Sequence, residues 1–156
     1  MSIIRKIFDE ESIGTITNDT KLSMMDIVKF VKEDKQNIAK VHEAATNGNL
    51  DCQLFISHVS FQSLQRHESN PFIDDETLTQ THKNLEQYTR LAAEQGDIDS
   101  QYNLAKYYLT MVDMSKGHID EEEASILKEA RRWYKKAHAN GHSDLSEIIS
   151  SLEFVQ

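Results

Sequence analysis

The sequence predicts an all-helical repeat protein, and three observations lead to this fold class. The 156 residues include one proline and five glycines, too few turn-forming residues for a many-stranded β protein. Apolar residues recur at the spacing of amphipathic helices over most of the chain. Gly48, Gly96 and Gly141 hold the same place in three similar phrases, 48 and 45 residues apart. Such a period fits one helical hairpin per repeat.

The repeated phrase reads as the end of one helix, a glycine corner and the start of the next helix. Its clearest copy is AAEQGDIDSQYNLAKYYL from Ala92, and weaker copies begin at Ala44 and Ala137. At fixed offsets from each glycine stand small residues, which let helices approach closely, and large residues, which fill the space between stacked hairpins. The small positions are Ala44, Ala92, Ala137, Ser57, Ala105 and Ser150, and the large ones are Ile56, Leu104 and Ile149.

Before the first repeat we expect two helices and a loop. Residues 2–9 place apolar side chains on one face of a short helix, which we expect to dock on the domain rather than on a membrane. Residues 12–20 read as a loop. Ser23 and Asp26 resemble a capping box at the start of a helix over 24–32. The inward positions of that helix would be Met24, Ile27, Val28 and Val31.

The first hairpin is predicted on either side of Gly48. One helix covers 36–47, and Gly48 ends it by supplying a left-handed C-cap. The next helix covers 50–65, with the Asn49 side chain accepting a free amide at its start. Residues 67–74, which include the single proline, are predicted to form a loop.

The second half of the chain predicts four more helices. They cover about 74–95, 97–111 and 120–140, with a last helix from Ser143, and 113–119 form a loop. The helix over 74–95 has an apolar or weakly polar stripe at Leu78, Leu85, Tyr88 and Ala92. The stripe of the helix over 97–111 is Tyr102, Leu104, Ala105, Tyr108 and Met111. The stripes of the last two are Ile126, Ala130, Trp133 and Ala137, then Leu145, Ile148, Ile149 and Leu152.

These residues resemble the Sel-one-like repeat (SLR) family, a relative of the tetratricopeptide repeat, over about 36–153. The matching positions are Ala130, Trp133, Tyr134, Ala137 and Gly141 in one half of the family pattern, and Gly96, Asp97, Gln101, Leu104, Ala105 and Tyr108 in the other. The first copy departs from the pattern at Lys40 and Cys52. The resemblance implies a right-handed α/α solenoid of two to three hairpins with capping helices at both ends.

The length fits one domain over 1–156, with 1–35 as an N-terminal capping segment and 36–156 as the repeats and C-terminal helix. The resemblance implies a protein-interaction adaptor, whose concave groove is lined by the helix after each glycine. Carried onto this chain, the groove positions are Leu54, His58, Phe61, Tyr102, Asn103, Lys106 and Leu109. The alternative that Leu54, Phe61 and Tyr102 are ordinary core residues stays open.

The composition and net charge limit the classes of partner that we expect this protein to bind. The net charge of −9 argues against nucleic acid and would suit a basic protein or peptide. Arg131, Arg132, Lys135 and Lys136 form one basic run, which we interpret as a solvated helix face rather than a site for an acidic partner. No apolar stretch is long enough for a membrane span or a secretory signal, so we expect a cytoplasmic protein with no membrane partner. Exposed helix ends leave a homo-oligomer open.

The sequence predicts no catalytic residue, metal site or cofactor. His138 and His142 are separated by Gly141, which breaks the helix that a zinc pair would need. Cys52 has no cysteine partner, and no glycine-rich phosphate loop is present. We therefore predict an adaptor. A bacterial immunity or inhibitor protein that neutralises a toxin is the alternative, distinguished by tight binding to one partner, and an enzyme ranks last.

Overall fold

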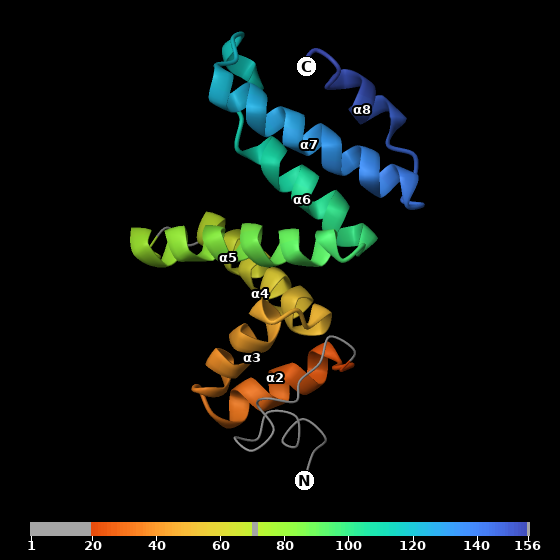
Figure 1. The fold of residues 1–156 in the computed structure, drawn as a ribbon. Helices are drawn as coiled ribbons and strands as arrows, with labels where there is room; N and C mark the ends of the chain where they lie inside the picture. Colours follow the sequence, from red (N-terminus) through yellow and green to blue (C-terminus); the bar gives the residue numbers. More distant parts are fainter. Residues whose placement is uncertain (1–19, 70–71, 156) are drawn as a thin grey trace. The chain divides into compact units, whose positions relative to one another are not determined.

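The computed structural model describes residues 20–69 and 72–155, and the regular elements of this part of the chain are all helices, without strands (Figure 1). Its elements are α2 (Met24–Glu33), α3 (Asn37–Thr46), α4 (Leu50–Ser69), α5 (Asp75–Glu94), α6 (Ile98–Thr110), the 3₁₀ turn η1 (Met114–Lys116), α7 (Glu121–Ala139) and α8 (Ser146–Ser151). The predicted all-α class is confirmed for these residues. The helix predicted over 2–9 and nearly all of the predicted loop over 12–20 lie outside them.

The chain divides into two compact units, and the boundary between Leu91 and Ala92 falls inside α5. We call them the N-terminal unit and the C-terminal unit. Each has its own core of buried apolar side chains. The prediction of one domain over 1–156 stays a prediction.

In the N-terminal unit α2 packs on α3 and α4. Ile27 is fully buried and Phe30 nearly so, whereas Met24 is 42 % exposed. The predicted inward position of Met24 is therefore wrong, and Phe30 was missed. Met24 occupies the first turn, directly after the Ser23 side chain that accepts the Asp26 N–H. Apolar spacing alone does not show which residues at the end of an apolar stripe are left uncovered by the neighbouring helices.

A ring of hydrogen bonds joins α3 to α5 within the same unit. The Thr46 hydroxyl donates to the His42 carbonyl at 2.9 Å and lies 3.2 Å from the Tyr88 hydroxyl. That hydroxyl also lies 3.2 Å from Nδ1 of His42, and the two rings meet edge to face with centroids 5.4 Å apart. Tyr88, predicted as part of the α5 stripe, is 5 % exposed.

The three glycine corners share one backbone geometry. Gly48, Gly96 and Gly141 have φ angles of 110°, 97° and 100°, which favour glycine. Each glycine N–H donates to the carbonyl three residues earlier, and the next N–H donates to the carbonyl five residues earlier. This is the Schellman pattern, which satisfies the last carbonyls of a helix. The predicted left-handed C-cap is confirmed at Gly48, and the same cap recurs at the other two corners.

At two of the corners, a buried glutamine also joins the two helices that flank the glycine. Five residues after the glycine, Gln53 donates to the Ala45 carbonyl at 2.9 Å, and Gln101 donates to the Ala93 carbonyl at 3.1 Å. Both side chains are almost completely buried. Each bond ties the start of one helix to the end of the helix before it, because the carbonyl three residues before the glycine lies in the preceding helix.

The third corner uses a different contact. Nδ1 of His138 accepts the Leu145 N–H at 3.2 Å, so the chain after Gly141 forms a loop before it becomes helical. The structure begins α8 at Ser146, three residues later than predicted. Leu145 and Leu152 are buried as expected, while Ile148 and Ile149 are half-buried against the same core.

The C-terminal unit is built on α6 and α7, which run side by side, with α8 packed on α7 (Figure 1). Its core holds Leu104, Trp133 and Tyr134, each no more than 1 % exposed. Two predicted positions need correction. Met111 is 47 % exposed because it follows the last residue of α6. Leu127, rather than Ile126, is the fully buried residue of the α7 stripe.

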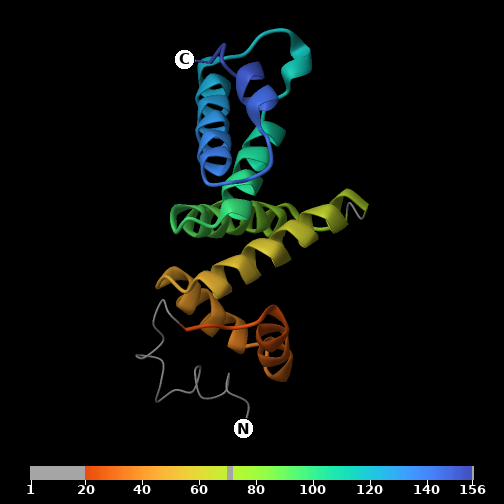
Figure 2. The same ribbon diagram turned by 90° about the vertical axis from the view of Figure 1, so that its right-hand side faces the viewer.

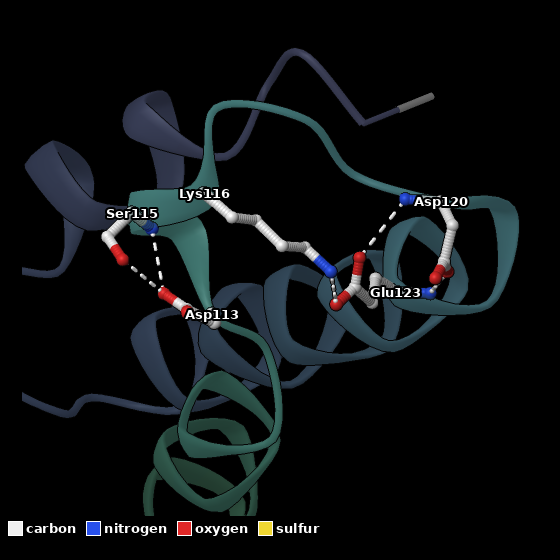
Figure 3. A network of polar contacts seen from close by, with 5 residues as sticks. All are labelled: Asp113, Ser115, Lys116, Asp120 and Glu123. Atoms are coloured by element: carbon white, nitrogen blue, oxygen red, sulfur yellow. Dashed lines mark hydrogen bonds and ion pairs between the residues drawn. The ribbon is translucent and has the colours of Figure 1, made fainter.

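The loop between α6 and α7 is held by side chains of its own (Figure 3). The Asp113 carboxylate accepts the backbone N–H and the hydroxyl of Ser115, which forms the short turn η1. Asp120 and Glu123 make a reciprocal capping box at the start of α7, and Lys116 donates to Glu123. Lys116 and the Asp120 backbone N–H lower the pKa of Glu123. These contacts hold the predicted loop over 113–119 in one conformation between α6 and α7.

Ala105 provides a test of close helix packing in the C-terminal unit. Its side chain is completely buried where α6 faces the unit core. Ala105→Leu is expected to overpack this contact and to lower the free energy of unfolding by about 1–3 kcal/mol. Denaturant unfolding followed by circular dichroism measures the change. Asn103→Leu, on the exposed side of the same helix, is the matched control, and equal stability of the two variants would contradict the assignment.

Candidate functional site

The seven predicted groove residues belong to two helices in different units. Leu54, His58 and Phe61 lie on α4 of the N-terminal unit. Tyr102, Asn103, Lys106 and Leu109 lie on α6 of the C-terminal unit. Each group therefore lies on its own unit.

On α6, the aromatic ring that was predicted to face a partner is already in contact with other rings. Tyr102 is half-buried and stacks on His142, with ring centroids 4.3 Å apart and planes 17° apart. It also meets Tyr134 edge to face at 5.8 Å. Burial, with a smaller contribution from Tyr102, raises the pKa of Tyr134 to about 12, so this buried hydroxyl stays neutral.

The remaining α6 positions divide between core and solvent. Leu109 is half-buried and packs against the C-terminal core. Lys106 is exposed, with Nζ 5.5 Å from the centre of the Tyr102 ring, and Asn103 is exposed beside it. The α6 surface therefore offers two polar side chains and no free aromatic ring.

On α4, by contrast, an aromatic side chain is open to solvent. Phe61 is 50 % exposed, His58 is exposed and Leu54 is half-buried. Counting at 100° per residue, these three positions share one face of the helix. Four further residues, whose mean direction is about 60° around the helix from these three, line an open hollow of about 570 Å³: Gln62, Gln65, Arg66 and Ser69. We call these seven residues the α4 face.

The length of α4 explains why this face is uncovered. α3 has 10 residues whereas α4 has 20, and the last turns of α4 extend past α3 (Figure 2). Every buried residue of α4 lies between Cys52 and Ser60. The sequence predicted an end near Gln65 and a loop from His67, but the helix continues to Ser69. With the end of the helix placed at Ser69, the i, i+3, i+4, i+7 spacing of Gln62, Gln65, Arg66 and Ser69 would have predicted that these four residues lie on one side of α4.

The acidic residues of α4 stand near its two ends, at Asp51 and Glu68. Residues 52–67 include no Asp or Glu, in a chain with 26 acidic residues among 156. Arg66 is exposed and makes no ion pair within residues 20–69 and 72–155. Glu68 is exposed seven residues after Phe61, so these two residues lie on the same side of the helix, about 20° apart.

The basic run of α7 differs from the α4 face, because three of its four side chains have partners in their own unit. Arg132 pairs with Glu129 at 2.9 Å and, like Lys136, lies 4.7 Å from the centre of the Trp133 ring. Arg131 donates to the Val155 carbonyl at 3.3 Å. Trp133 is buried beneath Arg132 and Lys136, while Arg132, Lys135 and Lys136 are exposed, as expected for a solvated helix face.

Reactive groups do not gather at either surface. Cys52 is buried, and burial together with the nearby Asp51 raises the pKa of its thiol to about 12, so it stays a thiol at neutral pH. Burial lowers the pKa of His42. The described residues contain no group of three His, Cys, Asp or Glu side chains arranged to hold a metal ion. None of their helices combines the length and apolar character needed to span a membrane.

Comparison with family models, with curated proteins and with solved structures finds no significant match to this chain. Of the two predicted groups, the α4 residues are the more accessible, since Phe61 is half exposed while Tyr102 is covered by His142 and Tyr134.

Proposed function

We propose that this protein is an interaction module that binds a segment of another protein on the α4 face. The observation that carries the proposal is Phe61, which keeps half of its surface exposed on α4. Burying a phenylalanine is worth about 1.5–3 kcal/mol, so a partner that covers this ring gains affinity. Aromatic side chains at the centre of an interface often dominate its binding energy.

The shape and polarity of the α4 face favour a protein segment over a small molecule. Small-molecule sites are concave and enclose most of the ligand, whereas the hollow beside Gln62 and Arg66 is open. Gln62 and Gln65 each offer donors and an acceptor, which suit the backbone groups of a bound chain. The face spans Leu54 to Ser69, about 22 Å along the helix axis, the length of six or seven extended residues.

We further propose that the fold is a right-handed α/α solenoid of the SLR type. In support, the hydrogen bonds of the glycine corner recur at Gly48, Gly96 and Gly141, and the buried glutamine recurs after the first two. In the SLR family the helix after each glycine lines the concave surface, and α4 is the helix after Gly48. A crystal structure of the full chain tests the arrangement of the repeats.

The adaptor proposal is tested by Phe61→Ala in the full chain. Phe61 truncation is expected to weaken capture of the specific partners by about tenfold, equivalent to about 1.4 kcal/mol. Tagged wild-type and variant proteins are incubated with lysate, and the captured proteins are quantified by mass spectrometry. Phe154→Ala is the matched control, because Phe154 is a similarly exposed aromatic residue, at 55 %, in the C-terminal unit.

The same experiment separates the two predicted surfaces. A double variant with Asn103→Ala and Lys106→Ala removes the exposed side chains of the α6 surface. Partners that are lost with this variant and retained with Phe61→Ala would show that the protein binds through α6, and the α4 proposal would then be wrong. Far-ultraviolet circular dichroism confirms that each variant is folded.

A further inference from the structure

We propose that His138 is a pH-sensitive switch at the connection between α7 and α8. In the neutral state its Nδ1 accepts the Leu145 N–H. In the protonated state the ring releases this N–H and pairs with the Asp144 carboxylate. The switch lies in the C-terminal unit, separate from the residues of the α4 face, and goes beyond the proposed function.

The hydrogen bond from Leu145 fixes the protonation state of the imidazole. A backbone N–H can only donate, and this one lies 3.2 Å from Nδ1 of His138, so Nδ1 carries a lone pair rather than a proton. The proton of the neutral ring is therefore on Nε2. The side chain is 42 % exposed, so a second proton can reach the ring from solvent. It binds at Nδ1, where it turns the acceptor into a donor that faces another donor.

A new partner for the protonated ring is already close to Nδ1. Oδ1 of Asp144 lies 4.0 Å from this nitrogen. The Asp144 carboxylate also accepts the hydroxyl and the N–H of Ser146, and these bonds lower its pKa, so it is charged throughout the range in which histidine titrates. An imidazolium that turns toward Asp144 gains a charged partner and moves away from the Leu145 N–H.

Asp144 is the one acidic side chain among the described residues whose carboxylate lies within 4.0 Å of the His138 ring. The elements packed around the connection carry other charged or titratable residues, which make no ion pair with the ring within 20–69 and 72–155. These residues are Asp99 and Lys106 of α6, Lys135 of α7, His142 of the connection and Glu147 of α8. The choice of partner therefore lies between the Leu145 N–H and the Asp144 carboxylate.

The hydrogen bond that changes holds the residue directly before α8. Leu145 is 8 % exposed, and its side chain belongs to the C-terminal core. The other end of α8 has separate attachments, because Leu152 and Val155 are buried in the same core and Arg131 donates to the Val155 carbonyl at 3.3 Å. Protonation of His138 should therefore loosen the start of α8 and leave its end attached.

The test is nuclear magnetic resonance of the full-length chain between about pH 7.5 and about pH 5.5, where histidine changes charge. At the upper pH the ring nitrogen shifts of His138 should identify the Nε2–H tautomer. A coupling across the hydrogen bond should connect Nδ1 to the Leu145 amide nitrogen. At the lower pH this coupling should disappear. Hydrogen exchange of the Leu145 amide, corrected for the intrinsic effect of pH, should become about fivefold faster, as expected for the loss of one ordinary hydrogen bond.

Three variants assign the effect to His138. In His138→Gln, whose side chain does not titrate, the corrected exchange of Leu145 should be the same at both pH values. His118→Gln is the matched control, because it removes an exposed histidine from the same unit and should keep the fivefold change, to within about a factor of two. Asp144→Asn removes the negative partner of the imidazolium, so loss of the coupling should require a lower pH.

An Nδ1–H tautomer of wild-type His138 at the upper pH would overturn the proposal, because such a ring cannot accept the Leu145 N–H. This measurement decides the matter even where a variant fails to fold. Corrected exchange of Leu145 that is independent of pH in the wild type would also overturn it. So would a change in His138→Gln as large as in the wild type. Circular dichroism at both pH values verifies that each variant is folded.

Discussion

Replacing Trp133 with alanine is expected to lower the free energy of unfolding of the C-terminal unit by about 3–5 kcal/mol. Trp133 is the largest side chain in that core and is 1 % exposed. Its removal leaves a cavity in that core and also removes the ring on which Arg132 and Lys136 lie. Because a domain has only about 5–15 kcal/mol of net stability, this variant should lose much of its fold near body temperature.

Urea unfolding followed by circular dichroism measures the effect, since the variant lacks the single tryptophan that fluorescence would report. Trp133→Phe is the matched control. The indole Nε1 has no hydrogen-bond partner among the described residues, so phenylalanine removes volume but no hydrogen bond. Its loss of stability should be clearly smaller. A Trp133→Ala variant within about 0.5 kcal/mol of wild type would place this side chain outside the core.

The second large effect is expected from Ile27→Ala, which should cost about 2–5 kcal/mol in the N-terminal unit. Ile27 is completely buried where α2 packs on α3 and α4. Hydrogen exchange read by mass spectrometry should show the loss of protection within α2, α3 and the first half of α4. The same measurement on Trp133→Ala should show its loss within α6, α7 and α8.

Met25 supplies the control for Ile27 because it lies two residues away and is 63 % exposed. Met25→Ala should change stability by no more than about 0.5 kcal/mol, as is usual for surface positions. If Met25→Ala were as damaging as Ile27→Ala, the buried face of α2 would be assigned incorrectly.

The parts of the fold that sequence predicts well are those determined by neighbouring residues. The glycine corners follow from the freedom of Gly48, Gly96 and Gly141 to adopt positive φ, and the start of α7 follows from the Asp120 side chain. The buried glutamines were missed as structural elements, although Gln53 and Gln101 stand at the same offset from their glycines. That shared offset was the sign available in the sequence.

The parts that sequence predicts poorly depend on the positions of distant residues. Tyr102 and Phe61 were both placed in a groove, yet only Phe61 is substantially exposed, because His142 stacks on Tyr102 from 40 residues away in the chain. Likewise, Leu127 and Ile126 are equally apolar, and only the packing of α7 determines which of them is buried. The accessible α4 face therefore could not be separated from the covered α6 positions before the tertiary contacts were known.

The hydrogen-bond ring of His42, Tyr88 and Thr46 fixes where the imidazole proton resides. Thr46 has one hydroxyl hydrogen and gives it to the His42 carbonyl, so toward Tyr88 it can only accept. Tyr88 must then donate to Thr46, and its oxygen accepts from His42. Neutral His42 is consequently the Nδ1–H tautomer. A second proton would bind at Nε2 and leave every donor in the ring unchanged, so the directions of these bonds are the same for both charge states of the histidine.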